Sequence, residues 1–253
     1  MGFEVAAEAY DRFMGRYSTQ LAPQLADLAE VGGDQRAIDV GCGPGALTAE
    51  LVSRLGAERV AAVDPSEPFV AAARSRHPGV DVRLASAEAL PFADGAFDVA
   101  LAQLVVHFMD DPVAGLREMA RVTRPGGVVA ACVWDFGGGR GPLGVFWEAA
   151  RELDPAAEGE SELPGTREGH LVELFAAAGL ADVMGGTLTA RLEHQTFESW
   201  WEPFTLSVGP AGSYVASLDP ERMAALRERC REMVSDAPFA VEAQAWAARG
   251  LSS

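Results

Sequence analysis

The sequence predicts an α/β protein built on a doubly wound, mostly parallel sheet of seven strands. Short apolar runs alternate with helical patterns through the first half of the chain, which is the order of βαβ units. The chain has 253 residues, 49% hydrophobic and 23% charged. That composition can fill the core of one large domain, alone or with a smaller lid.

Five strands are expected in the first half of the chain, each a short apolar run that ends at a turn or a helix. They are expected over residues 36–40, 60–63, 80–84, 97–102 and 127–134. Between them we expect helices over 46–55, from Ser66 to the break at His77, and over 112–122. These alternating elements predict the parallel part of the sheet.

The alternation is lost after Trp134. The glycine-rich stretch 137–142 is expected as a flexible link, and 154–164 as a polar loop. The last two strands are expected over 180–192 and 239–247, with a helix over 168–178 and further helices over 196–234. We therefore predict four segments: N-terminal helices over 1–33, the sheet-bearing core over 34–195, a helical lid over 196–236, and a closing strand and tail over 237–253.

The charge balance excludes several kinds of chemistry. The net charge is −17 and all 20 basic residues are arginine, so a Schiff-base lysine, a pyridoxal-phosphate anchor and a Walker lysine are excluded. The negative field argues against a nucleic-acid partner. The three cysteines are too widely spaced for a disulfide framework or a zinc pattern.

Nothing in the sequence indicates a membrane or export signal. The first residues are acidic and do not resemble a signal peptide. Apolar runs are far shorter than the ~20 residues that span a bilayer. We expect a cytoplasmic protein without a membrane span, and the sequence contains no signature of an oligomeric state.

The loop from Asp39 to Ala46 predicts a nucleoside site. Its glycines allow a tight turn and a close approach of backbone to a ligand. Asp64 follows Gly41 by 23 residues, at the end of the second strand, where its carboxylate can accept both hydroxyls of a ribose. The loop also satisfies the G-x-G-x-x-A pattern of a dinucleotide site, but Asp39 stands where such loops have an apolar residue, and Pro44 also departs from them.

Three further motifs follow the loop in order: Ala85–Phe92, Asp94–Val99 and Arg121–Gly127. The ordered set resembles the class I S-adenosylmethionine (SAM) methyltransferases, and among them the small-molecule enzymes of the ubiquinone/menaquinone-biosynthesis type. The resemblance covers about residues 10–133 and is weaker over the C-terminal half. It implies a Rossmann-like fold with SAM as cofactor and S-adenosylhomocysteine as product. Arg124 departs from the lysine that many relatives have there.

The resemblance assigns the cofactor-binding roles by position. It implies that the backbone of Gly41, Cys42 and Gly43 lines the methionine part of SAM, while Asp39 orients the loop and the ammonium group. The ribose falls to Asp64, with Pro65 beside it, and the adenine edge to Ala87 and Glu88. Gln103 faces the amino-acid end or the methyl group. Tyr10 and Arg16 belong to a helical segment over the cofactor, where the Arg16 guanidinium suits the SAM carboxylate.

Each of these residues also has a plainer interpretation. Asp64 can be an acid at a helix start, Glu88 a solvated acid, and Arg16 a surface residue. No metal is expected, because Asp110 and Asp111 before Pro112 are typical of a helix start.

His107 is the candidate catalytic base. The sulfonium of SAM already activates the methyl group, so the protein needs mainly to align an acceptor and exclude water. A base helps when the acceptor is a phenol, an alcohol or an acidic carbon. In similar enzymes the position of His107, four residues after Gln103, lies on the acceptor side; alternatively the ring only packs beside Phe108.

The C-terminal half is expected to supply a pocket for a small, aromatic or lipophilic acceptor. Its large apolar side chains can form either the pocket walls or the core of the lid: Phe136, Trp147, Trp200, Trp201 and Phe204. The sequence leaves open whether oxygen, nitrogen or carbon is methylated. Two other functions stay open: an NAD(P)-dependent oxidoreductase on a similar sheet, and a SAM-binding interaction module without catalysis.

Overall fold

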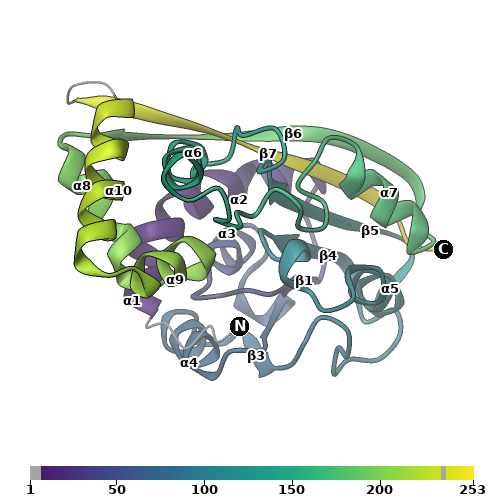
Figure 1. The fold of residues 1–253 in the computed structure, drawn as a ribbon. Helices are drawn as coiled ribbons and strands as arrows, with labels where there is room; N and C mark the ends of the chain where they lie inside the picture. The colour runs from purple at the N-terminus through teal and green to yellow at the C-terminus, as the bar shows by residue number, and fades with distance from the viewer. Residues whose placement is uncertain (1–6, 235–237) are drawn as a thin grey trace.

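A computed structural model describes residues 7–234 and 238–253, which contain one seven-stranded sheet (Figure 1). The strand order is β3-β2-β1-β4-β5-β7-β6. The strands are β1 (Ala37–Val40), β2 (Val60–Asp64), β3 (Asp81–Leu84), β4 (Phe97–Gln103), β5 (Thr123–Trp134), β6 (Ala181–His194) and β7 (Phe239–Leu251).

The sheet is mostly parallel, which confirms the predicted fold class. The five strands β1 to β5 all pair in parallel, and β7 pairs antiparallel with both β5 and β6. The chain reverses its winding direction between β1 and β4, which are neighbours in the sheet. In such sheets the crevice at the carboxyl ends of the strands beside that point is the usual ligand site.

Helices cover both faces of the sheet because its strands alternate their side chains between two cores. Val99 and Leu101 of β4 belong to the core under α2 (Arg16–Leu28) and α3 (Ala46–Leu55). Ala100 and Ala102 belong to the opposite core, under α5 (Pro112–Val122) and α7 (His170–Ala177). The remaining crossover helix is α4 (Glu67–Arg76), and a short helix η2 (Ala57–Arg59) precedes β2.

A third core lies under the helices at one end of the molecule, where Figure 1 shows α8, α9 and α10 gathered together. Phe146 and Phe204 stack there with ring centroids 4.5 Å apart. The helices that enclose this core are α6 (Gly144–Leu153), α8 (Phe197–Trp201), η4 (Glu202–Leu206), α9 (Gly209–Ser217) and α10 (Pro220–Met233). Helix α6 thus packs with the predicted lid, although it comes earlier in the chain.

The N-terminal helices precede the sheet as α1 (Ala7–Tyr10), a π-helical turn η1 (Asp11–Gly15) and α2. Residues 1–6, the last residues of the predicted lid (235 and 236) and the first residue of the predicted closing segment (237) lie outside the described residues. Within the described ranges, no helix combines the length and apolar character needed to cross a bilayer.

Candidate active site

A cavity of about 660 Å³ opens at the carboxyl ends of the parallel strands. Its volume falls within the range of small-molecule sites. One side is lined by residues at or just after the ends of the first three strands: Gly41, Gly43, Asp64, Pro65, Ala87 and Glu88. The other side is lined by residues from the end of β5 to α9, among them Phe136, Leu143, Glu160, Leu163, Val208 and, in α9, Ala211. The cavity therefore joins the predicted cofactor residues to the lid.

The glycine loop and Asp64 lie in direct contact at one side of this cavity. The backbone N–H groups of Gly41 and Cys42 both donate to Val63 O, at 2.8 and 2.9 Å, which fastens the loop to β2. Asp64 accepts from Gly43 N through Oδ2 and from Ser66 N through Oδ1, each at 2.8 Å. Burial raises the pKa of Asp64 above its ordinary value. The loop and the carboxylate thus line one crevice.

The loop adopts a backbone that requires glycine at Gly41. Its φ is +74°, and a Cβ there would lie 2.4 Å from Val105 Cγ2. His77 closes the far side of the loop, since its Nε2 lies 3.1 Å from Gly45 O. It is therefore half-buried against the loop, at the residue where the sequence predicts the end of the helix.

Asp39 and Gln103 each carry a buried oxygen without a partner among the described residues: Asp39 Oδ1 and Gln103 Oε1. Asp39 Oδ2 accepts from Thr48 Oγ1 at 2.6 Å, and Gln103 Nε2 donates to Ser18 O at 3.1 Å. Both residues line one small pocket with Cys42 and Gly41. Two acceptors left free in one pocket match a ligand group that donates several hydrogen bonds, such as an ammonium.

Burial raises the pKa of Asp39 to about 7, with the Asp64 carboxylate adding to the rise and Thr48 opposing it. A cation bound at this point would favour the charged form and bring the pKa down.

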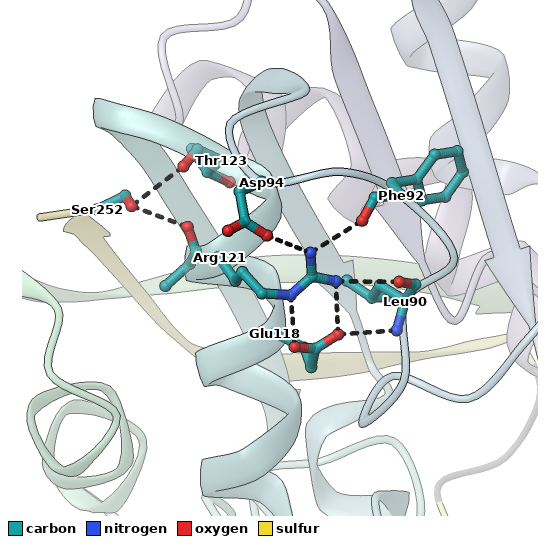
Figure 2. Close-up of polar contacts among 8 residues, drawn as sticks. Leu90, Phe92, Asp94, Glu118, Arg121, Thr123 and Ser252 are labelled. Atoms are coloured by element: carbon teal, nitrogen blue, oxygen red, sulfur yellow. Dashed lines mark hydrogen bonds and ion pairs between the residues drawn. The ribbon is translucent and has the colours of Figure 1, made fainter.

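The segment after β3 carries Ala87, which is buried, and Glu88, which is half-buried, into the wall of the cavity. Figure 2 shows how Arg121 of α5 holds the continuation of this segment. Its guanidinium donates to the carbonyls of Leu90 and Phe92, at 3.0 and 2.9 Å, and pairs with Glu118. Glu118 in turn accepts from Leu90 N. This network fixes the backbone next to Ala87 and Glu88.

His107 lies on the short helix η3 (Val106–Phe108), between the two sides of the cavity. The ring contacts Phe108, with centroids 4.0 Å apart, and Phe136, at 6.0 Å. Burial lowers the pKa of His107 to about 3, so its imidazole is neutral at physiological pH. Leu104 precedes it with φ of +61°, a turn that directs the chain into the cavity.

The two candidate residues from the N-terminal helices, Tyr10 and Arg16, lie in different places. Tyr10 lines the cavity, and its ring packs edge-on against Phe69 with centroids 5.5 Å apart. Arg16 instead lines a small pocket beside His194 and Phe204, and it does not line the cavity of Gly41 and Asp64. Helix geometry explains the difference, because residues six apart on a helical segment do not share one face.

Of the five large aromatic residues predicted for the acceptor pocket, one lines the cavity and four do not. Phe136 lines the cavity. The other four are buried in the third core, under the helices at one end of the molecule, and do not line the cavity: Trp147, Trp200, Trp201 and Phe204. In their place, Glu160 reaches the cavity from the stretch that the sequence predicts as a polar loop. A single acid in such a stretch carries no local signal of burial.

Metal-binding side chains do not gather at the site. Across the described ranges, no group of three or more His, Cys, Asp or Glu residues could hold a metal ion. Asp111 caps α5 by accepting from Ala114 N at 3.0 Å, which is the helix start that the sequence indicates.

The fold and the cavity define an α/β enzyme with a nucleoside site, and comparison with known proteins gives its family. Residues 38–131 match the family model described as a methyltransferase domain. An uncharacterized methyltransferase of Mycobacterium sp. (strain JLS) is 33% identical over 202 residues, which cover 75% of this chain and 79% of that protein. The malonyl-[acyl-carrier protein] O-methyltransferase of Hahella chejuensis is 35% identical over 127 residues, 49% of this chain and 45% of that one.

A solved structure has the same fold. The phosphoethanolamine N-methyltransferase 2 of Haemonchus contortus, in complex with phosphomonomethylethanolamine and S-adenosylhomocysteine, superposes with a TM-score of 0.60 at 18% identity, over 98% of this chain and 57% of that one. This chain belongs to the class I SAM-dependent methyltransferases, and SAM is its cofactor. The comparisons support neither an oxidoreductase nor a binding module without catalysis.

Proposed function

We propose that this methyltransferase acts on a small organic acceptor, aromatic or lipophilic, held between the sheet and the lid. The observation that carries the proposal is the single cavity that joins the glycine loop to apolar residues of the second half, including Phe136, Leu143 and Val208. Such walls bind a flat or apolar molecule and exclude water. The match to the Hahella relative covers less than half of that protein, so its acceptor does not carry over to this chain.

The residues present fit SAM. The Asp64 carboxylate suits the ribose hydroxyls, and the unpartnered oxygens of Asp39 and Gln103 suit the ammonium of the methionine part. Gly41 lines the cavity with its backbone, and a side chain at this position would clash with Val105. Ala87 and Glu88 would contact the adenine, with Tyr10, Cys42, Gly43 and Pro65 completing the cofactor side.

When bound, SAM supplies an electrophilic methyl group on a sulfonium. The protein's own part is to hold the acceptor in line with that methyl group and to keep water away. Trp134, Phe136 and Phe108 provide apolar surface beside His107. The neutral His107 ring can donate or accept a hydrogen bond, and we assign it the positioning of the acceptor.

Isothermal calorimetry with SAM and S-adenosylhomocysteine tests the cofactor side. We expect Asp64→Asn to weaken binding about 10-fold or more, because it removes a charged acceptor of the ribose hydroxyls. Asp81→Asn, at an exposed acid on β3, is the matched control and leaves binding unchanged.

Release of S-adenosylhomocysteine with a panel of small aromatic, small polar and macromolecular acceptors tests the acceptor side. Turnover confined to polar or macromolecular acceptors would contradict the proposed class.

A further inference from the structure

Glu160 is a buried carboxylate on the acceptor side of the cavity. It lies between α6 and α7, is 4% exposed, and lines the same cavity as His107 and Phe136. Trp147 Nε1 donates a hydrogen bond of 3.0 Å to its Oε2. Within the described residues, no arginine forms an ion pair with Glu160. Two influences act on its pKa: burial raises it, and the hydrogen bond from Trp147 lowers it. Oε1 is thus left for a ligand.

The backbone around Glu160 is held in place by hydrogen bonds. Leu163 N donates to Glu160 O at 3.2 Å. Thr166, which is fully buried, donates through Oγ1 to the carbonyls of Ser161 and Leu163, at 2.9 and 2.7 Å. Gly137 N donates to Thr166 O and ties the segment to the link after β5. The carboxyl group is therefore presented to the cavity in one position rather than carried on a free loop.

A buried carboxylate without a cation is costly unless a hydrogen-bond donor faces it. Oε2 has such a donor in Trp147, whereas Oε1 accepts no hydrogen bond from a described residue. Glu160 lines a cavity whose walls include the apolar side chains of Phe136, Leu143, Val208 and Ala211. Burial raises the pKa of Glu160 to about 7, with the Trp147 bond opposing the rise. A base with a pKa close to the working pH is the most effective one.

We infer that Glu160 is the general base for an acceptor that carries a hydroxyl group on an aromatic ring. The inference rests on the proposed function, since it takes the cavity to hold the acceptor. The apolar walls suit the ring, and Oε1 suits the hydroxyl. A phenol has a pKa of about 10, so it reaches the site protonated and must lose its proton as the methyl group arrives.

Methyl transfer to the hydroxyl group moves one proton to Glu160. Its Oε1 takes the hydroxyl proton as the O–H bond breaks, and a lone pair of the phenol oxygen forms the new O–C bond to the methyl group. The C–S bond breaks and its electron pair stays on sulfur, which changes from a sulfonium to a neutral thioether. Glu160 ends as a carboxylic acid and returns its proton to water after the product leaves.

His107 is the weaker candidate for this role. It faces the same cavity, but burial lowers its pKa to about 3, so it takes up a proton far less readily than Glu160. The other titratable or charged groups that face the cavity or the segment of Glu160 are Tyr10, Asp64, Glu88, Asp110 and, beside Gly159, Arg151. Tyr10 packs against the third core and edge-on against Phe69, whereas Asp64 ends β2 and Glu88 and Asp110 follow β3 and β4.

The test compares Glu160→Gln with Glu162→Gln, an exposed acid two residues along. A glutamine side chain can still accept the hydrogen bond from Trp147, so the variant keeps the packing of the cavity wall and loses only the base. The probes are naphthol and its methyl ether, titrated by calorimetry into protein saturated with S-adenosylhomocysteine at about pH 8. We expect wild type and Glu162→Gln to bind naphthol about 10- to 100-fold more tightly than the ether, and Glu160→Gln to lose that preference.

Turnover of naphthol with SAM gives the second readout. Glu160→Gln should lower kcat about 100-fold or more and remove the acid limb of the kcat/KM profile near pH 7, with affinity for S-adenosylhomocysteine unchanged. Trp147→Phe should shift that limb to higher pH, because it removes the bond that opposes the rise in pKa. A residue with only a structural role would not move the limb.

The outcomes separate the two proposals. Equal binding of naphthol and its ether by wild type and Glu160→Gln overturns the role of Glu160 and leaves the apolar acceptor class standing. Failure of both probes to bind wild type contradicts the acceptor class, and with it this inference. A preference for naphthylamine over naphthol that Glu160→Gln removes overturns the hydroxyl class in favour of an amine.

Discussion

Gly41→Ala should destabilise the protein and weaken the cofactor site through one close contact. A Cβ at Gly41 would lie 2.4, 2.8 and 2.9 Å from Cγ2, Cβ and Cγ1 of Val105, at a backbone φ of +74°. The left-handed backbone costs about 1–2 kcal/mol for a residue with a Cβ. Overpacking against Val105 adds about 1–3 kcal/mol. The total loss in the free energy of unfolding is about 2–5 kcal/mol.

Gly43→Ala is the matched control, since it lies in the same loop with φ of +52° and no atom within 4 Å of its Cβ position. It should lose only the backbone part, about 1–2 kcal/mol. Urea unfolding of both variants measures the difference. Adding Val105→Ala to Gly41→Ala should recover part of the loss, because the two γ carbons go while the Cβ at 2.8 Å remains. Equal losses at Gly41 and Gly43 would refute the contact argument.

Four further predictions test other parts of the account. SAM binding should release up to about one proton near pH 7, because a bound ammonium lowers the raised pKa of Asp39; calorimetry in buffers of different ionisation enthalpy measures it, and Asp39→Asn should abolish it. In the free protein the same residue stabilises the fold below pH 3.8 and loses that contribution as the pH rises to about 7, so the stability of wild type relative to Asp39→Asn should fall over that range. Arg121→Met should cost about 1–3 kcal/mol of stability and weaken binding of S-adenosylhomocysteine through Ala87 and Glu88, whereas Arg124→Met, at a more exposed arginine, should leave binding unchanged. Phe146→Ala should cost about 3–5 kcal/mol in urea unfolding, because the ring is fully buried and stacked on Phe204; a loss below about 1 kcal/mol would mean that the lid core is not packed as described.

The parallel part of the sheet could be predicted because its signals are local. Strands buried on both faces appear as short apolar runs, and glycine or proline marks where the next helix begins or ends. The helices predicted over 46–55 and 112–122 have those bounds in the structure, and the strand predicted over 36–40 is Ala37–Val40.

Strand ends were less predictable where pairing overrides the local signal. The fifth strand begins at Thr123 rather than at 127, because Thr123 pairs with Phe97 across a register shift, although Pro125 and two glycines follow it. The last strand continues to Leu251, which pairs with Val128 and Ala181. These pairings join residues far apart in the sequence and leave no local pattern.

The same distinction holds at the site. Gly41 and Asp64 stand at fixed positions after strands, so the sequence places them in one crevice. Arg16 and Glu160 depend on how the N-terminal helices and the lid pack. The family resemblance therefore assigned Arg16 to the cofactor, whereas it lines a pocket beside His194. The stretch that holds Glu160 is a loop, as the sequence predicts, but no local pattern marks this acid as buried in the cavity wall.

A crystal structure with S-adenosylhomocysteine tests most directly whether one nucleoside spans the loop and the carboxylate. We predict that the ribose hydroxyls donate to Asp64 and that the amino group donates to Asp39 and Gln103. The sulfur should face the part of the cavity that is lined by Phe136, His107 and Glu160. A nucleoside bound elsewhere, or an Asp64 that stays bonded to Gly43 N with no ribose contact, would contradict the account.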